Sequence, residues 1–536
     1  MTTTMSDARA IDPPPELSSQ RRATVLFAMC LALVMVVAGV SMLINALPLI
    51  AQDLDLSQSS QAWVVDAYAL PFAALLMIAG ALGDRYGRRG ALLAGAAIFG
   101  IGSLLSAFAS GSGDLFAYRA ITGVGAALIM PGTLSTITSV FPVEARARAV
   151  GIWAGFAMGG GTLGLLGSGL LLRYYSWDSV FVVAALLALV AFAAIALAVP
   201  NSRATEHVSL DPGGTLLSAL GVGAVVFGVI EGPVHGWTSA LTFLSIGGGL
   251  LALAAFVWWE LRVENPLLDP RLFRLRGFGT GSAGLFIMFL AMFGFFLVAM
   301  QFLQLILGYS PLKAAVALLP QMLVMLPLSA AAAQLSERFG QRRMTAAGLL
   351  VAAAGMALLA TLTASSGYWH FFAGMMIVSV GIGLAMTPAT TAIVASLPPS
   401  KQGVASAVND TAREVGGALG IAILGSAFNT AYRSGITDHL GGLSAQDATN
   451  AREAPALSFD VANHLGDNGH GLVVATQNAF ESGLRSAVLI SAALFAAAAL
   501  YTWWRGQDAA PAIAADDDED DAVAPVREAE LVLEAG

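Results

Sequence analysis

About fourteen runs of roughly 20 apolar residues divide this chain, and each run is long enough to cross a lipid bilayer as a helix. Only 11% of all residues are charged, whereas a soluble domain carries about 25%. A chain with so few charged side chains cannot cover a water-exposed surface, so its solvent is lipid. The sequence therefore predicts an all-α integral membrane protein. The runs lie near 24–48, 61–82, 90–109, 114–138, 149–171, 179–199, 214–231, 240–259, 280–304, 314–335, 344–363, 369–392, 404–428 and 484–504.

Arginine and lysine are concentrated in every second connection between these runs. The alternate connections are nearly free of them, and four contain none: 49–60, 110–113, 232–239 and 364–368. Because basic residues accumulate in the cytoplasmic loops of membrane proteins, this pattern predicts that both termini are cytoplasmic. We expect a multi-pass protein of the inner (cytoplasmic) membrane, with residues 1–22 as a cytoplasmic N-terminal segment.

Two polar segments stand out from the apolar runs. Residues 506–536 contain ten acidic residues and one basic residue, which accounts for the whole net charge of −9. A tail of this composition has too little apolar surface to fold, so we expect a disordered acidic cytoplasmic tail. The connection 430–483 is long and polar and is expected on the extracytoplasmic side. Its sequence fits a small ordered cap and a flexible loop equally well.

The chain contains an internal repeat. A charged turn from Gly80 to Gly90 recurs near residues 334–343, and glycine and proline patterns recur at similar distances. Three pairs of equivalent residues are 253, 257 and 256 residues apart: Asp84 and Glu337, Pro131 and Pro388, and Gly160 and Gly416. The nearly constant offset predicts two six-helix bundles in the same orientation, at 23–199 and 279–505. Six spans do not fill the offset, so the two spans within 200–278 are an insertion.

These motifs resemble those of the major facilitator superfamily and, more narrowly, of its 14-span drug:proton antiporter family (EmrB/QacA type). The turn from Gly80 to Gly90 resembles the superfamily's motif between helices 2 and 3. Arg119 with Gly123 and Gly125 resembles its helix 4 motif. The resemblance implies a major-facilitator fold, with two pseudo-symmetric six-helix bundles plus two inserted transmembrane helices. It also implies proton-coupled export of amphipathic, often cationic, toxic compounds by alternating access.

Two positions depart from the pattern of that family. Gly39 stands where helix 1 usually carries an aspartate, and Leu165 stands where the fifth-helix antiporter motif usually has proline. The first departure removes one candidate proton site, and the second weakens the specific prediction of antiport. The alternatives are a dedicated exporter of an endogenous metabolite or lipid precursor, a proton symporter for uptake, and a transporter-like sensor or scaffold.

Charged residues inside the apolar runs are the first candidates for function, because a charge in the membrane core is costly and rarely kept without a use. Asp66 in the second run and Arg119 in the fourth lie at similar depth. We predict that Asp66 is a proton site and that Arg119 is its partner or modulator, because a carboxylate that changes between paired and unpaired surroundings can take up and release a proton. The alternative is a static structural ion pair.

A second charged group lies in the thirteenth run. Asp410 is three residues from Arg413 and four from Glu414, so Asp410 shares one helical face with both of them. The arginine neutralises one acid and leaves a net charge of −1, which suits a proton or an organic cation. The alternative is an intrahelical charge network near the cytoplasmic funnel.

The charged turns are predicted to form a cytoplasmic gate. Asp84 with its neighbouring arginines is expected to act as a latch, because an acid at a helix end can bind the N-terminus of a helix from the opposite half. Topological anchoring alone is the alternative. The gate motif comprises Gly80, Gly83, Asp84, Arg85, Gly87, Arg88 and Arg89, with Glu337 and Arg338 in the second repeat.

Further residues are assigned to the cavity or to helix packing. Asn45, Gln301 and Gln304 are cavity candidates, and Glu231 is interpreted as a residue at the boundary of the first inserted span. Glycines within the apolar runs permit close helix packing and also make bending less costly. The helix-bend candidates are Gly160, Gly161, Gly164, Gly416 and Gly417.

Several classes of chemistry have no support in the sequence. There is no nucleotide-binding loop of the type Gly-x-x-x-x-Gly-Lys-Ser/Thr, so the expected energy source is a proton gradient and no cofactor is expected. Cys30 is the single cysteine, and the six histidines have no metal-ligand spacing. We expect no enzyme activity, no metal and no nucleic-acid partner. The expected partners are a small amphipathic substrate, protons and the lipid bilayer, and the expected state is a monomer.

Overall fold

A computed structural model describes residues 18–56, 58–200, 211–397 and 401–506. Fourteen helices in these ranges are long and apolar enough to cross a membrane, and no strand is present in them. The prediction of an all-α protein with fourteen spans is therefore confirmed. Except for Gly506, the predicted acidic tail lies outside the described residues, as does most of the N-terminal segment.

The helices form two six-helix halves with an inserted pair between them in the chain. The first half consists of α1 (Ser19–Asp53), α2 (Gln58–Tyr86), α3 (Arg88–Ser106), α4 (Ser112–Val140), α5 (Val143–Leu171) and α6 (Asp178–Ala198). The inserted pair is α7 (Pro212–His235) and α8 (Ala240–Glu260). The second half has six spans, because the short α10 (Pro311–Ala317) and α11 (Leu319–Phe339) together make one span; the other five are α9 (Arg276–Gln301), α12 (Gln341–Leu359), α13 (Tyr368–Ala395), α14 (Gln402–Thr437) and α17 (His470–Arg505). In lipid this architecture follows from the backbone, because a helix satisfies its own hydrogen-bonding groups.

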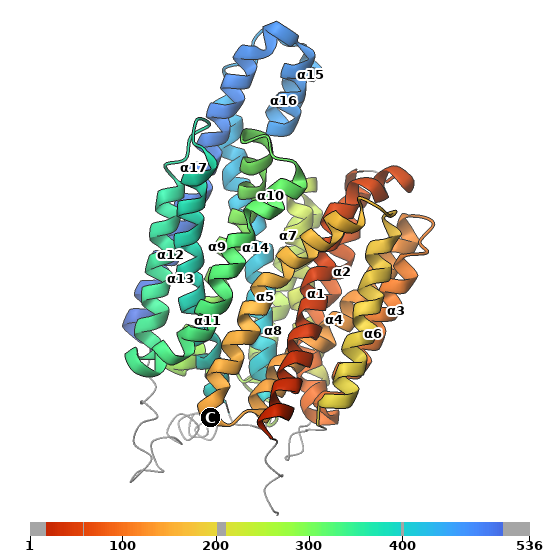
Figure 1. Cartoon of the computed structure of the whole chain (residues 1–536), viewed down its shortest axis with the longest axis vertical. Coiled ribbons are helices and arrows are strands. Elements are labelled where there is room, and N and C mark those ends of the chain that lie inside the picture. The colour runs from red at the N-terminus through yellow and green to blue at the C-terminus, as the bar shows by residue number, and fades with distance from the viewer. Residues whose placement is uncertain (1–17, 57, 201–210, 398–400, 507–536) are drawn as a thin grey trace, which may run out of the picture.

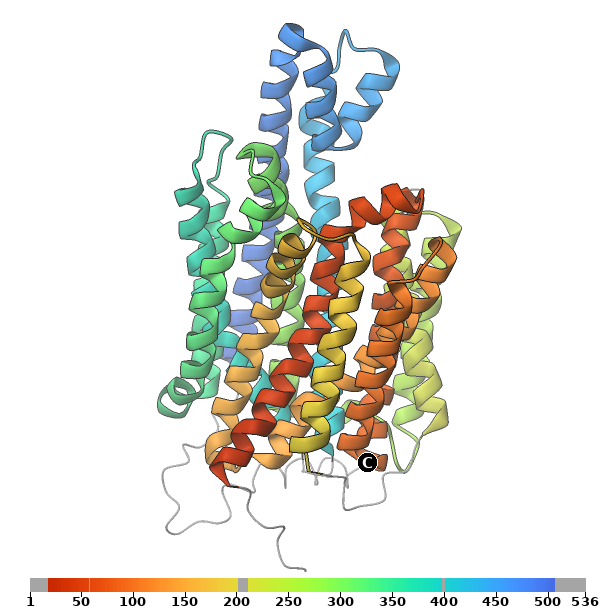
Figure 2. The ribbon, with the colours of Figure 1, turned by 45° about the vertical axis from the view of Figure 1, so that its right-hand side comes forward.

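Both described chain ends lie at the same end of the bundle, as Figures 1 and 2 show. We call this the arginine-rich end, because it holds the turn with Arg85, Arg88 and Arg89. The opposite end carries two short helices, α15 (Ala445–Glu453) and α16 (Pro455–His464), and we call it the cap end. An even number of spans requires this common placement of the chain ends.

Two pairs of equivalent helices are packed closely at glycines. A β-carbon on Gly164 of α5 would lie 2.7 Å from the carbonyl oxygen of Ala38 on α1. In the second half, a β-carbon on Gly416 of α14 would lie 2.5 Å from the carbonyl oxygen of Phe286 on α9. The other bend candidates, Gly160, Gly161 and Gly417, contact the same two partner helices at 3.1–3.3 Å. All five glycines therefore lie at close helix contacts, and their part in bending stays a prediction.

Replacement of Gly420 by alanine is expected to destabilise the second half. A β-carbon at this position would collide with the carbonyl oxygen of Leu290, which is backbone and cannot rotate away. Overpacking of this kind costs about 1–3 kcal/mol, so thermal stability in detergent, measured by loss of the monodisperse peak in size-exclusion chromatography, should fall. The matched control is Gly284→Ala, because nothing lies within 4 Å of a β-carbon there. Equal stability of the two variants would contradict the packing argument.

The connection 430–483 is largely helical. The two flanking helices, α14 and α17, continue into it, and α15 and α16 connect them and pack against their extended ends. The hydroxyl of Tyr432 donates a hydrogen bond of 2.8 Å to the carbonyl oxygen of Ala451, and the hydroxyls of Ser458 and Thr476 are 2.6 Å apart. Of the two alternatives that the sequence left open, the structure contains the helical cap.

The inserted helix α7 contacts both halves. Its Phe227 ring lies 5.9 Å from the ring of Trp63 on α2, and its Val225 and Val229 form an apolar cluster with Ala422 on α14. Helix α8 packs against α7, and much of its apolar surface is exposed, including Phe243, Leu244 and Leu251. This surface suits contact with lipid, whereas α7 is in a position to contribute side chains to the bundle interior.

Candidate functional site

The latch residue Asp84 joins the two halves at the arginine-rich end. It is 1% exposed, and its Oδ2 accepts a hydrogen bond of 2.7 Å from the backbone N–H of Gly403, the second residue of α14. Its Oδ1 accepts hydrogen bonds from Nε and Nη2 of Arg88, at 3.1 and 2.8 Å. The first turn of a helix has N–H groups without intrahelical partners, and it attracts negative charge. This is the predicted type of contact, an acid of one half on a helix N-terminus of the other.

The remaining residues of the gate motif differ in their surroundings. Arg89 donates a hydrogen bond of 2.6 Å to the carbonyl oxygen of Ala196, which anchors α3 to the end of α6. Arg85 is exposed, with its guanidinium over the Tyr86 ring. The glycines of the motif permit close packing, since a β-carbon on Gly80 would lie 2.6 Å from the carbonyl oxygen of Gly403. Gly87 has a φ of 111°, a backbone conformation that favours glycine, in the turn between α2 and α3.

The second copy of the turn does not form a second latch. Glu337 is exposed, and the described residues give it no hydrogen bond or ion pair. Arg338 is also exposed and lies over the ring of Phe339. The charged turn is therefore repeated in sequence, but only the first copy, through Asp84, contacts a helix N-terminus of the other half in the described residues.

Arg119 contacts α2 through Tyr68 and Val64 and forms no ion pair with Asp66. Its guanidinium carbon lies 4.6 Å from the centre of the Tyr68 ring, and its Nε donates a hydrogen bond of 3.1 Å to the carbonyl oxygen of Val64. Val64 and Tyr68 are four residues apart and lie on one face of α2. Asp66 is two residues from each, about 200° around the helix. The predicted pairing of Asp66 with Arg119 is therefore wrong in this structure, because the two side chains lie on different sides of α2.

Asp66 instead faces the inserted helix α7. Ala74 marks this contact, because its β-carbon lies 3.4 Å from a β-carbon built on Gly223. The helices are antiparallel, and Asp66 and Glu231 are each eight residues from this contact, in the same direction along the bundle. The two acids therefore lie at the same depth. The Asp66 and Glu231 carboxylates interact electrostatically, and Oε2 of Glu231 lies 2.6 Å from Nδ1 of His235. Glu231 is the second-to-last residue of the span Pro212–Gly232, so it lies at the boundary of the inserted span as predicted, and its side chain is only 4% exposed.

The acids of α14 form a buried group at the contact between the halves. Asp410 is fully buried and accepts a hydrogen bond of 3.1 Å from Asn409, and its Oδ1 lies 3.7 Å from Nη1 of Arg413. The Arg413 guanidinium lies between two aromatic rings, 5.3 Å from Trp153 of α5 and 4.7 Å from Phe289 of α9. Glu414 is partly exposed and interacts electrostatically with Asp410 and Arg413. The three residues lie together, as their spacing predicts.

The three cavity candidates have different positions. Asn45 donates hydrogen bonds of 2.9 Å to the carbonyl oxygen of Leu165 and to the hydroxyl of Ser168, so its amide nitrogen joins α1 to α5. Gln301 ends α9, and Gln304 lies in the π-helical turn that follows it, near the cap end. Asn45 also lies close to α10, since a β-carbon on Gly169 would lie 3.9 Å from its amide nitrogen and 3.2 Å from Leu312, and a cavity common to the three residues stays a prediction.

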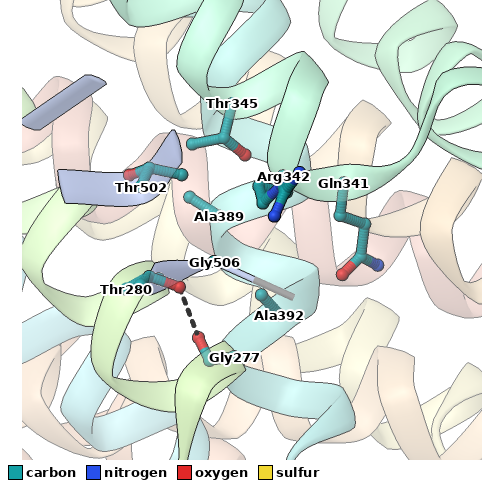
Figure 3. Close-up of a pocket in the computed structure, with 10 residues that line it drawn as sticks. Gly277, Thr280, Gln341, Arg342, Thr345, Ala389, Ala392, Thr502 and Gly506 are labelled. Atoms are coloured by element: carbon teal, nitrogen blue, oxygen red, sulfur yellow. Dashed lines mark hydrogen bonds between the residues drawn. The ribbon is translucent and has the colours of Figure 1, made fainter. Parts of the chain in front are cut away.

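Two small pockets lie within the second half. The first is at the arginine-rich end between α9, α12, α13 and α17, where Thr280, Gln341 and Arg342 lie around it (Figure 3). The second lies between α9, α11 and α13 and includes Met292 and Gln321. Neither pocket is lined by an acidic residue, so neither includes the buried acids. Within the described ranges, no group of three or more histidine, cysteine, aspartate or glutamate side chains is arranged to hold a metal ion.

Sequence reasoning did not single out Tyr68, and it did not predict that Glu231 is buried and faces Asp66. A signal for Tyr68 was present in the sequence, because a stripe of aromatic and apolar residues at four-residue spacing runs along α2 and ends in a glycine of the gate motif. That stripe consists of Tyr68, Phe72, Leu76 and Gly80. The sequence carried no equivalent signal for Glu231, because the position of an inserted helix around the bundle does not follow from its own residues.

Comparison with known proteins adds independent information. A family model described as Major Facilitator Superfamily matches residues 29–421. The chain is 34% identical over 489 residues to the multidrug efflux pump LfrA of Mycolicibacterium smegmatis, covering 91% of this chain and 97% of that protein. It is 37% identical over 400 residues to the puromycin resistance protein pur8 of Streptomyces alboniger, covering 74% and 79%. The solved structure of the proton:xylose symporter XylE with 6-bromo-6-deoxy-D-glucose aligns with a TM-score of 0.58 at 16% identity, covering 92% of this chain and 97% of that one, and this likeness concerns the fold alone.

Proposed function

The chain belongs to the Major Facilitator Superfamily, and on this basis we propose that it exports amphipathic or cationic small molecules in exchange for protons. The observation that carries the proposal is the placement of acidic side chains inside the bundle. Asp66 on α2 faces Glu231 on α7, and Asp410 and Glu414 lie on α14 at the contact between the halves. Ionisable groups at such depth are expensive and mark ion or proton pathways in transporters.

The relatives support the choice of substrate class. One is named a multidrug efflux pump and another a puromycin resistance protein, and both match most of this chain. An excess of buried carboxylates over arginines suits a cation, because Arg413 balances one acid of α14 and Arg119 lies against Tyr68. We infer that protons and substrate occupy these acids in turn while the arginine-rich end, facing the cytoplasm, opens and closes at the Asp84 contact.

The proposed function is tested with purified protein in liposomes and ethidium as the probe. An imposed proton gradient of the correct direction should drive ethidium accumulation, and a protonophore should abolish it. Ethidium movement that ignores the gradient would contradict proton coupling. If well-folded protein moves no ethidium, drug export is contradicted and a dedicated exporter of a metabolite or lipid precursor becomes the better proposal.

Replacement of Glu231 by glutamine is expected to reduce gradient-driven ethidium transport. The change removes the negative charge that Asp66 faces across the α2–α7 contact, while the shape of the side chain is kept. One pKa unit corresponds to a tenfold change in proton occupancy, so we expect about a tenfold lower initial rate at fixed pH. The control is Glu453→Gln, the same change at an exposed position on α15. Equal rates for wild type, Glu231→Gln and the control would remove Glu231 from the mechanism.

A further inference from the structure

Tyr68 has a buried hydroxyl group that the site described above does not use. The residue is 2% exposed and lies near the middle of α2. Its hydroxyl oxygen has no hydrogen-bond partner among the described residues, although it is shielded from solvent. A buried hydroxyl without a partner costs about 1–3 kcal/mol. A hydroxyl group that is kept at this cost in stability indicates a function for its proton.

The packing of α2 against α14 places Tyr68 at the depth of Glu414. A β-carbon on Gly80 would lie 2.6 Å from the carbonyl oxygen of Gly403 and 2.8 Å from the β-carbon of Ala407, so the two helices are in contact there. The helices run antiparallel. Twelve residues from Gly80 lead to Tyr68, about 18 Å along α2, and eleven residues from Gly403 lead to Glu414, about 16 Å along α14. The two side chains are therefore at the same depth, and they interact electrostatically.

The ring of Tyr68 is held from the other side by α4. Arg119 lies over one face of the ring at 4.6 Å, and Phe72 lies 5.5 Å from it on the same stripe of α2. A β-carbon on Gly123 of α4 would collide with the carbonyl oxygen of Tyr68, which shows how closely the backbones approach. The ring therefore has little freedom to move.

The charged surroundings of Glu414 come from three helices. Asp410 and Arg413 are on α14 itself, Tyr68 is on α2, and Arg119 lies behind Tyr68 on α4. Arg413 lies between the rings of Trp153 and Phe289, and Tyr68 brings a hydroxyl group from the first half to the surroundings of this acid.

We propose that Tyr68 is a positioning residue that donates a hydrogen bond to the Glu414 carboxylate when Glu414 releases its proton. The inference rests on the proposed proton-coupled transport and assigns one group in it. A hydrogen bond to an ionised acceptor is roughly twice as strong as one between neutral groups. Release of the proton from Glu414 therefore strengthens the contact between α2 and α14, and uptake of a proton weakens it. The hydroxyl thus connects the protonation of the second half to its contact with the first.

The experiment measures ethidium transport in liposomes as a function of pH for wild type, Tyr68→Phe, Glu414→Gln and the double variant. Tyr68→Phe removes only the hydroxyl and keeps the ring under Arg119. Loss of the hydrogen bond makes the ionised form of Glu414 less favourable, so the pH of half-maximal transport should move upward by about one unit. In the Glu414→Gln background, where equilibration of ethidium without a gradient is followed, the shift should be absent, because the acceptor is no longer an acid. The control is Tyr118→Phe, the same change on α4 at a partly buried tyrosine.

Each other outcome has a defined meaning. An unchanged pH profile in Tyr68→Phe, or a shift that persists in Glu414→Gln, would overturn the assignment while leaving the proposed function intact. A change in the ethidium concentration for half-maximal transport at every pH, without a shift of the profile, would assign the hydroxyl to substrate instead. Wild type without any proton dependence would overturn both proposals. If Tyr68→Phe does not fold, Glu414→Asp withdraws the acid by one methylene and should shift the profile in the same direction; an unshifted Glu414→Asp profile would then overturn the assignment.

Discussion

Asp84→Ala is expected to reach the membrane in normal amounts and to lose most of its transport. The change removes the acceptor of the Gly403 N–H and of the Arg88 guanidinium, and with it the polar contact that joins α2 to the start of α14. Hydrogen bonds to charged groups contribute about 1.5–3 kcal/mol each. A shift of that size changes the balance between open and closed forms by about tenfold to a hundredfold.

The repeat supplies the matched control for this variant. Glu337 is the equivalent of Asp84 in the second turn, but it is exposed and has no hydrogen bond or ion pair among the described residues. Glu337→Ala should therefore transport at nearly the wild-type rate. The measurement is the initial rate of ethidium transport normalised to the amount of protein in the membrane. Normal turnover of Asp84→Ala, or equal losses in both variants, would refute the latch.

Asp66→Asn is expected to abolish gradient-driven accumulation of ethidium while the protein still equilibrates the dye across the membrane. The amide has almost the shape of the carboxylate but cannot exchange a proton near neutral pH. A positioned acid or base commonly accelerates proton transfer by about 10²–10⁴-fold, so we expect the coupled rate to fall by about two orders of magnitude. The measurement is accumulation under an imposed proton gradient compared with equilibration without one.

The control for Asp66→Asn is Asp114→Asn. Asp114 is an exposed acid at the start of α4, where it bonds to Ser110. This variant should be indistinguishable from wild type. Wild-type coupling in Asp66→Asn would show that Asp66 carries no proton in the cycle. If Asp410→Asn and Glu414→Gln also transport normally, the acids of α14 are structural.

The features of the fold that the sequence predicted are those set by length and periodicity. Fourteen apolar runs give fourteen spans because the bilayer fixes the length of a helix that crosses it. The repeat offsets predicted a duplicated bundle, and the pair α5 and α14 packs at equivalent glycines against α1 and α9. The type of contact made by Asp84 was predicted for the same reason, because a helix N-terminus attracts an acid wherever the two meet.

The features that the sequence did not predict depend on how each helix is rotated. Counting residues along the helices correctly gave Asp66 and Arg119 a similar depth. The direction in which each side chain points depends on the rotation of its helix, which packing against neighbouring helices decides. Tyr68 faces α4 and α14, whereas Asp66, two residues earlier, faces α7. The partner Glu231 lies on an inserted helix, and the docking of α7 is set by surfaces of α2 and α14 that come from opposite halves.

The length of α14 and α17 gives the cap a mechanical consequence. Each helix has 36 residues, about 54 Å at 1.5 Å per residue, whereas the hydrocarbon core of a bilayer is about 30 Å thick. The bond between Tyr432 and Ala451 ties the cap to α14, and the contact between Ser458 and Thr476 ties it to α17. The cap therefore moves together with the second half, and it lies far from any axis about which that half rotates. If that half rotates by about 15°, a point about 30 Å from the pivot sweeps about 8 Å, so reporter groups on α15 and on the cap end of α1 would magnify a small rocking motion.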